Sequence, residues 1–203
     1  MHKNLWLITF FTLLLFGCTA KEADTSYLKN YVDNPQITSD AKLIEPNDRQ
    51  SSSKGSVELT QANFEKQEFT VGPMKLTFYD AKQIQVTPDI SMIDYFHVLT
   101  TDEEFSIVKT FLSIENMGNE LVQFNPAAFA TTSTGEQWTW EQEAYLDELN
   151  GAYEPGQTKK GNVGFILEKK EKPKNFTLQT SDIFDAKKDI VSSGTKITLP
   201  LTD

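Results

Sequence analysis

Apolar and polar side chains alternate most regularly between Phe105 and Asn116. Val108, Leu112 and Ile114 share one parity of this stretch, and Lys109 stands at the opposite parity with the other polar residues. A period of two with β-branched and aromatic residues is typical of a strand that is buried on one face. We therefore predict a central strand here, with the three apolar side chains facing the core and Lys109 facing solvent.

Shorter segments of the same character follow along the chain, separated by turn residues rich in Gly, Pro and Asn. The predicted strands are 69–71, 74–86, 121–124, 129–132, 137–140, 158–167, 176–180 and 195–199. A bulge is expected near residues 80–82, and a hairpin joins 129–132 to 137–140. Many short strands without a long amphipathic helix indicate an all-β fold, a two-sheet sandwich.

The amino terminus has a different pattern. Lys3 precedes an uncharged apolar run from Leu5 to Phe16, which is shorter than the roughly 20 residues of a spanning helix. The run ends at Gly17 and Cys18, so the chain resembles a bacterial lipoprotein precursor. The resemblance implies cleavage between these two residues and lipid attachment to the Cys18 sulfur, which would hold the protein at the extracytoplasmic face of the cell membrane.

The segment that follows is polar, has no sustained period and contains Pro35 and Pro46. These properties predict a flexible linker. We therefore divide the chain into a signal peptide (1–17), a lipidated cysteine with its linker (18–56) and a β-sandwich domain (57–203). Cys18 is the one cysteine of the sequence, so the domain must be held together by its core without disulfides.

Several turn and core residues of the predicted domain resemble a known family. They are the run from Val108 to Asn119, Thr134-Gly135, Pro155 to Thr158, Gly161 and Phe165. The pattern resembles the immunoglobulin-like immunoprotective extracellular protein superfamily, which includes domains of unknown function in surface lipoproteins of low-GC Gram-positive bacteria. The resemblance covers about residues 57–203. It implies an immunoglobulin-like sandwich and carries no catalytic residue.

Charge excludes one class of partner. The formal net charge is -10, and Arg49 is the single arginine. Binding to nucleic acid or to anionic headgroups relies on clustered basic residues, and arginine is preferred for bidentate phosphate contacts. We therefore expect no nucleic-acid partner, and we expect the membrane contact to be made through the lipid anchor.

Few residues are suited to catalysis. His97 is the one histidine left after removal of the signal peptide, and its aromatic surroundings favour a structural role. Ligand counts exclude a zinc site of nitrogen and sulfur ligands, and we predict no cofactor. Carboxylates gather at 102–104 and at 141–148. Both groups lack the spacing of a known calcium loop, so a solvated acidic face is favoured, and calcium binding by these oxygen ligands stays open.

Aromatic residues provide the candidate binding site. Trp138 and Trp140 share one face of a predicted strand, and Tyr145 follows closely. Exposed aromatic side chains would anchor a partner, whereas buried ones would belong to the core, and we expect at least one of the two tryptophans to be buried. The sequence favours a non-catalytic binding module for an envelope protein or glycan. The alternative is a carboxylate-based enzyme or a substrate-binding lipoprotein.

Overall fold

The computed structural model describes residues 24–32, 36–169 and 171–202. The predicted signal peptide, Gly17 and Cys18 lie outside these residues. Almost all regular structure is β, and the α-helix α1 has four residues, Ile93–Phe96. Within the described residues no helix is long and apolar enough to cross a bilayer.

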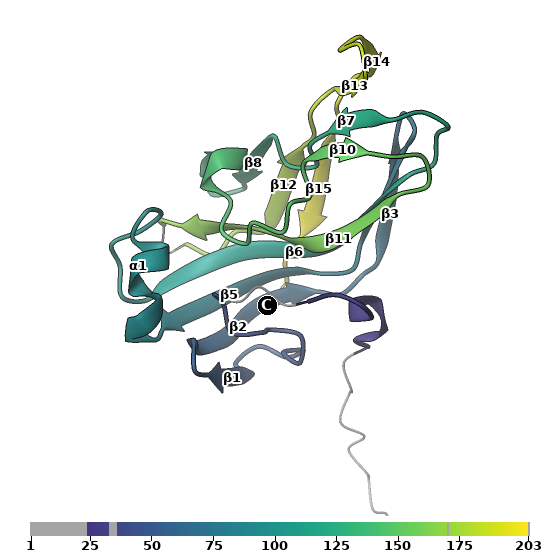
Figure 1. The fold of residues 1–203 in the computed structure, drawn as a ribbon. Coiled ribbons are helices and arrows are strands. Elements are labelled where there is room, and N and C mark those ends of the chain that lie inside the picture. The colour runs from purple at the N-terminus through teal and green to yellow at the C-terminus, as the bar shows by residue number, and fades with distance from the viewer. Residues whose placement is uncertain (1–23, 33–35, 170, 203) are drawn as a thin grey trace, which may run out of the picture.

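Seven strands form the main sheet, in which β6 is central (Figure 1). On one side β6 pairs with β5 through its first half and with β4 through its second half, and on the other side it pairs with β11. The strands of this sheet are β1 (Arg49–Ser52), β2 (Gly55–Asn63), β3 (Gln67–Val71), β4 (Met74–Phe78), β5 (Ala81–Pro88), β6 (Phe105–Asn116) and β11 (Thr158–Leu167).

Two smaller antiparallel sheets of four strands each complete the fold. The β7 sheet contains β10 (Gly151–Tyr153), β7 (Val122–Phe124), β13 (Ile183–Asp185) and β14 (Ile190–Ser192). The β12 sheet contains β15 (Lys196–Pro200), β12 (Asn175–Gln179), β8 (Phe129–Thr132) and β9 (Gln137–Thr139). Three single 3-10 turns are η1 (Ser26–Leu28), η2 (Ile90–Met92) and η3 (Trp140–Gln142).

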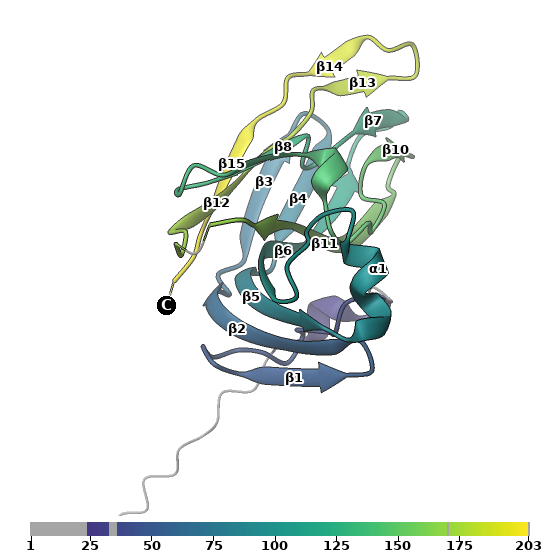
Figure 2. The ribbon, with the colours of Figure 1, turned by 90° about the vertical axis from the view of Figure 1, so that its left-hand side faces the viewer.

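The predicted all-β sandwich is confirmed as two antiparallel layers. The main sheet is one layer, and the two smaller sheets together form the other (Figure 2). Leu112 and Phe165 from the main sheet meet Phe176 and Leu178 from the β12 sheet in one apolar cluster, the sandwich core. The hairpin of β13 and β14 extends beyond this core (Figure 2).

The predicted bulge lies between β4 and β5. Phe78 stands opposite Leu112 and Lys82 opposite Lys109, so three residues of this edge face two residues of β6. The extra residue frees Asp80, whose carboxylate accepts a hydrogen bond from the Phe111 amide at 2.7 Å. One long predicted strand is therefore two strands joined by a bulge.

The prediction that Lys109 faces solvent is wrong. The odd-numbered face of β6 is also covered, and Lys109 is only 2% exposed. Phe105 and Ile107 belong to a second apolar cluster, together with Ile37 and Leu43 from the segment before β1. Both faces of the central strand are thus buried, because chain segments outside the sandwich cover the second face.

Much of the predicted linker is among the segments that cover this face. The predicted start of the domain at residue 57 is therefore wrong. The Tyr27 ring stacks on Tyr79 at 4.8 Å, and the Tyr31 ring meets Phe111 edge-on at 4.9 Å. Residues 36–56 continue into β1 and β2, and Ile37 is buried. The described parts of residues 24–56 therefore pack as part of the domain, since their scattered apolar residues find partners on the main sheet.

A buried ion-pair cluster fixes this segment to the sheet. The two oxygens of the Asp40 carboxylate contact Lys109 Nζ at 2.6 Å and Lys82 Nζ at 2.9 Å. Asp80 adds a second carboxylate 3.6 Å from Lys82 Nζ. Buried charges are tolerated when they are paired and hydrogen-bonded in this way. Lys82 and Lys109 are therefore both interior residues.

Candidate functional site

The 3-10 turn η3 forms a ridge between two hollows of the surface. Trp138 and Gln142 line the first hollow, whereas Trp140, Glu141 and Glu143 line the second. The Gln142 side chain closes the turn by accepting a hydrogen bond from the Thr139 amide at 3.0 Å. Trp138 and Trp140 of the predicted aromatic site therefore line two different hollows.

The two tryptophans do not share a face, which corrects the predicted arrangement. Trp138 lies in β9, is 7% exposed and stacks on Phe165 with a ring separation of 5.5 Å. Trp140 is 50% exposed. The strand parity is lost because β9 ends at Thr139 and η3 begins at Trp140. The expectation that at least one tryptophan is buried is confirmed.

Tyr145, the third candidate binding residue, is also an interior side chain. It is 3% exposed and belongs to the second apolar cluster. The ammonium group of Lys109 lies 5.1 Å from the centre of its ring. Tyr145 and Trp138 are thus packing residues, and Trp140 is the one of the three that presents a large surface to solvent.

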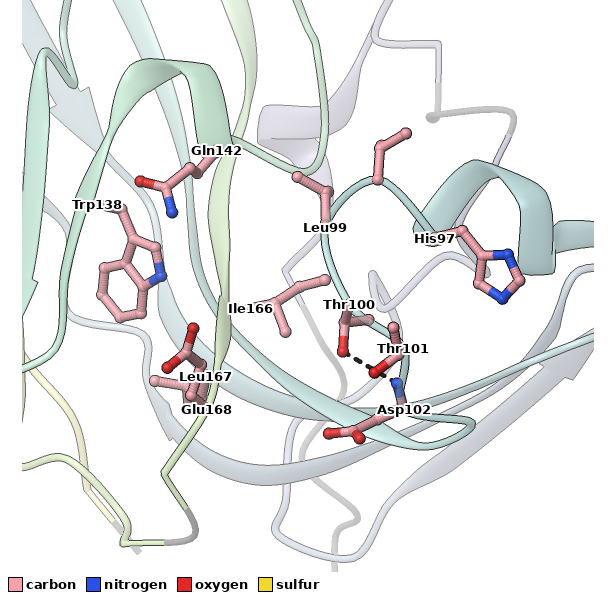
Figure 3. Close-up of a pocket in the computed structure, with 11 residues that line it drawn as sticks. His97, Leu99, Thr100, Thr101, Asp102, Trp138, Gln142, Ile166, Leu167 and Glu168 are labelled. Atoms are coloured by element: carbon pink, nitrogen blue, oxygen red, sulfur yellow. Dashed lines mark hydrogen bonds between the residues drawn. The ribbon is translucent and has the colours of Figure 1, made fainter.

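The first hollow measures about 470 Å³. Figure 3 shows Trp138 and Gln142 on one side, His97 on the opposite side and Ile166 between them. The Asp102 amide donates to the Thr100 hydroxyl at 3.2 Å, so this wall is an ordinary loop turn. His97 is exposed at the end of α1, directly after the aromatic residues that favoured a structural role for it.

The second hollow measures about 330 Å³ and is bounded by the acidic loop, residues 141–150. Its apolar rim is formed by Trp140 and by Leu146, which is 64% exposed. The lining residues are Asn125, Pro126, Ala127, Trp140, Glu141, Glu143, Leu146, Asp147, Glu148, Leu149, Asn150, Asn162 and Val163. This hollow combines exposed apolar area with carboxylates, and we treat it as the candidate site.

The acidic loop is held against the free edge of β11 by its own carboxylates. Glu143 accepts hydrogen bonds from the Gly164 amide at 3.0 Å and from the Tyr145 and Leu146 amides at 2.8 and 2.7 Å. Asp147 accepts from the Asn162 amide at 2.7 Å. The two carboxylates therefore take the place of carbonyl groups from a neighbouring strand and satisfy backbone donors of this edge.

Two glycines of β11 permit this close approach. A Cβ atom on Gly164 would lie 2.8 Å from the Tyr145 ring, and one on Gly161 would lie 2.6 Å from Asp147 Cβ. Tyr31 adds a further contact, because its hydroxyl donates to Asp147 at 2.6 Å. The amino-terminal segment, the acidic loop and β11 are therefore locked together beside the candidate site.

Burial raises the pKa of the two carboxyl groups that hold the loop, those of Glu143 and Asp147. Removal from water raises the pKa of Glu143 to about 7, although the three backbone N–H donors oppose this shift. Desolvation also raises the pKa of Asp147, against hydrogen bonds from Tyr31 and Asn162. A carboxyl with a pKa near 7 is chemically suited to proton transfer. In Glu143, however, both oxygens are engaged by backbone amides.

The predicted acidic groups do not form a metal centre in this arrangement. No group of three or more His, Cys, Asp or Glu side chains within residues 24–32, 36–169 and 171–202 is placed to hold a metal ion. The backbone of the loop has two non-glycine residues in the left-handed region, Leu146 and Glu148, with φ values of 56° and 50°. Such conformations persist only where the surrounding contacts fix them, as the bonds to Glu143 and Asp147 do here.

The comparisons with known proteins give a relative by sequence and a neighbour by structure. No family model matches the chain. It is 37% identical over 194 residues to the uncharacterized protein YdhF of Bacillus subtilis strain 168, and the alignment covers 88% of this chain and 81% of YdhF. A functionally unknown protein from Listeria monocytogenes EGD-e has a solved structure with a TM-score of 0.50 and 12% identity, over 72% of this chain and 87% of that one. This second likeness concerns the fold alone, whereas the identity to YdhF is high and extends over most of both proteins: the chain belongs to the same family as YdhF.

Proposed function

We propose that this protein is a lipoprotein of the cell membrane, anchored at its extracytoplasmic face, whose β-sandwich is a non-catalytic binding module for an envelope protein or glycan. The observation that carries the binding role is the exposure of Trp140 and Leu146 at the rim of the second hollow. Large apolar side chains that are exposed beside a hollow are typical anchors of interfaces.

The rigidity of the acidic loop supports this role. Glu143 and Asp147 hold the loop to β11 through hydrogen bonds to backbone amides. A surface that is already ordered loses little conformational entropy when a partner binds. The same hydrogen bonds argue against catalysis, because the carboxylates nearest to the hollow are engaged in holding the backbone.

The lipid anchor rests on the sequence Gly17-Cys18 after the apolar run. Seven residues, 19 to 25, separate Cys18 from Ser26, the first residue of η1. Fully extended, seven residues span about 25 Å at most. An anchored domain would therefore stand close to the bilayer, and its partner would be a component of the membrane or of the adjacent cell wall.

The anchor is tested by replacing Cys18 with alanine. We expect the Cys18→Ala chain to incorporate no labelled fatty acid and to keep its signal peptide, because the thiol is the acceptor of the lipid. Normal labelling of this variant would exclude lipidation at Cys18.

The binding role is tested by capture from detergent-solubilised envelope with the full chain as bait. Trp140→Ala should remove the captured component, whereas Ile90→Ala should retain it, since Ile90 is 82% exposed and lies in η2, outside the site. Capture that is identical with both variants, or no specific capture by the wild-type chain, would contradict the proposal.

The alternative, a carboxylate-based enzyme or substrate-binding lipoprotein, is favoured by the raised pKa of Glu143 beside a hollow. The two functions differ in what Glu143→Gln does. An enzyme would lose a turnover of some envelope substrate, whereas a binding module would keep its partner as long as the loop stays folded.

A further inference from the structure

We infer that the second hollow receives a lysine or arginine side chain from a basic segment of a partner protein. This inference rests on the proposed binding function and names the chemistry of the partner.

The charges of the hollow are of one sign. Four carboxylates contribute to its lining, at Glu141, Glu143, Asp147 and Glu148, and no Lys, Arg or His is among the lining residues. None of the ion pairs formed within the described residues includes any of the four. A hollow of low-dielectric walls concentrates this negative potential, so it attracts a cation and repels an acidic partner.

Lys109 and Lys159 both approach the acidic loop from outside the lining, and the Lys109 ammonium lies 5.1 Å from the centre of the Tyr145 ring. Lys159 Nζ donates to the backbone carbonyls of Glu148 and Asn150, at 3.3 Å each, and lies 4.6 Å from the centre of the Tyr153 ring. Its contacts are with carbonyl oxygens and an aromatic face. Glu143 and Asp147 are engaged in holding the loop, so the exposed Glu141 and Glu148 are the carboxylates offered to an incoming cation.

The apolar rim matches the rest of a long basic side chain. The Trp140 ring offers a π-face, which attracts an ammonium or guanidinium group at distances up to about 6 Å. Leu146 stands at the same rim with 64% of its surface exposed. Lysine and arginine bury their methylene stems on apolar surface while the charged end finds polar partners, so the rim and the carboxylates serve the two ends of one side chain.

The size of the hollow favours a side chain over a larger ligand. About 330 Å³ is at the lower end of the roughly 300–1,000 Å³ that small-molecule sites occupy. Trp140 is 50% exposed at the rim, so the remainder of a partner would contact it from outside the hollow. A peptide segment in which basic and apolar residues alternate is the simplest occupant with these properties.

The test uses two synthetic peptides and the full chain in non-ionic detergent. One peptide is acetyl-Lys-Leu-Lys-Leu-Lys-amide, and its counterpart carries Glu in place of each Lys. Calorimetric titration should show binding of the lysine peptide, weakening as salt is raised, and no binding of the glutamate peptide. Trp140→Ala should weaken binding about tenfold or more, as expected when an interface tryptophan is truncated.

Variants that remove one negative charge distinguish binding in the hollow from attraction to the overall negative charge of the protein. Glu148→Gln should weaken binding by about threefold, whereas Glu65→Gln should leave it unchanged, because Glu65 is equally exposed but lies between β2 and β3. Equal binding of both peptides, equal effects of the two glutamine variants, or absence of binding by the lysine peptide would each overturn the inference. If the lysine peptide fails while an envelope component is still captured through Trp140, the binding function stands and the basic character of the partner is wrong.

Discussion

Lys109 Nζ lies 2.6 Å from the Asp40 carboxylate, across 69 positions of the sequence and in the interior of the protein. The contact joins the centre of the main sheet to the amino-terminal segment. It explains why a segment without sequence periodicity is ordered: Asp40 brings a charge that two buried lysines require.

Asp40→Ala should therefore destabilise the fold strongly. The substitution leaves Lys109 without its carboxylate and Lys82 with Asp80 alone, and breaking one side of a buried ion pair costs about 3–5 kcal/mol. Urea unfolding measures the change. Glu68→Ala is the control, because it breaks ion pairs with Lys66 and Lys75 that are exposed and worth under about 1 kcal/mol. Similar costs for the two variants would show that the interior cluster does not hold the segment.

Limited proteolysis should place the domain boundary before residue 27. Tyr27, Tyr31 and Asp40 all make contacts with the main sheet, so a protected fragment should retain them. Mass spectrometry of the stable fragment gives its first residue. A fragment that begins between about 50 and 65 and unfolds at the same urea concentration as the full chain would contradict this boundary and support the flexible linker that the sequence predicted.

Stability should fall as the pH rises from about 5 to 8. The folded-state pKa of Glu143 is raised to about 7 by desolvation, so its stabilising contribution is full below about pH 4.5 and is lost as the pH rises through 7. The raised pKa of Asp147 acts in the same sense. Asp40 acts in the opposite sense, because Lys109 and Lys82 hold its pKa below the usual range and its contribution is lost only under acidic conditions.

Urea unfolding at pH 5, 6, 7 and 8 measures this dependence. We expect a difference on the order of 2–3 kcal/mol across the range for the wild-type chain and a smaller one for Glu143→Gln, which cannot ionise. A rise in stability over the same range, or an unchanged slope in the variant, would show that ionised Glu143 is well accommodated by its three backbone donors.

The regular strands were predictable from the sequence. The run from Thr158 to Leu167 and the run from Phe105 to Asn116 have the predicted bounds, because period-two alternation over ten or more residues leaves little ambiguity. The bulge near Asp80 was visible as polar residues at positions 80 and 82 between two apolar runs of the same parity. Short strands such as β13 and β14, with three residues each, carry too little pattern to be predicted.

Long-range contacts account for the errors. Lys109 occupies a polar position of an alternating strand, and only the distant Asp40 makes that position an interior one. Trp138 and Trp140 are two positions apart, so they would share a face if the strand continued, but the strand ends at Thr139 and η3 begins at Trp140. The candidate site was thus predicted in part: its aromatic anchor was found, whereas the role of Glu143 in fixing the acidic loop requires knowledge of the β11 edge.

The sequence of β11 itself contains a signal that another segment, here the acidic loop, packs closely against this strand. Gly161 and Gly164 interrupt a strand that is otherwise rich in β-branched and large apolar residues, and glycine within a strand often marks the close approach of another segment. The sequence does not say which segment approaches. The structure identifies it as the acidic loop, through Asp147 and Tyr145.

Site-specific photocrosslinking in intact cells tests the central claim most directly, namely that this protein binds an envelope partner through the surface at Trp140. A benzophenone amino acid is placed at position 140, and in separate chains at the exposed positions 98 and 190 as controls. We predict one discrete ultraviolet-dependent adduct from position 140 and none of that mass from Val98 or Ile190. An adduct from either control position in the absence of one from position 140 would place the binding surface elsewhere and contradict the account.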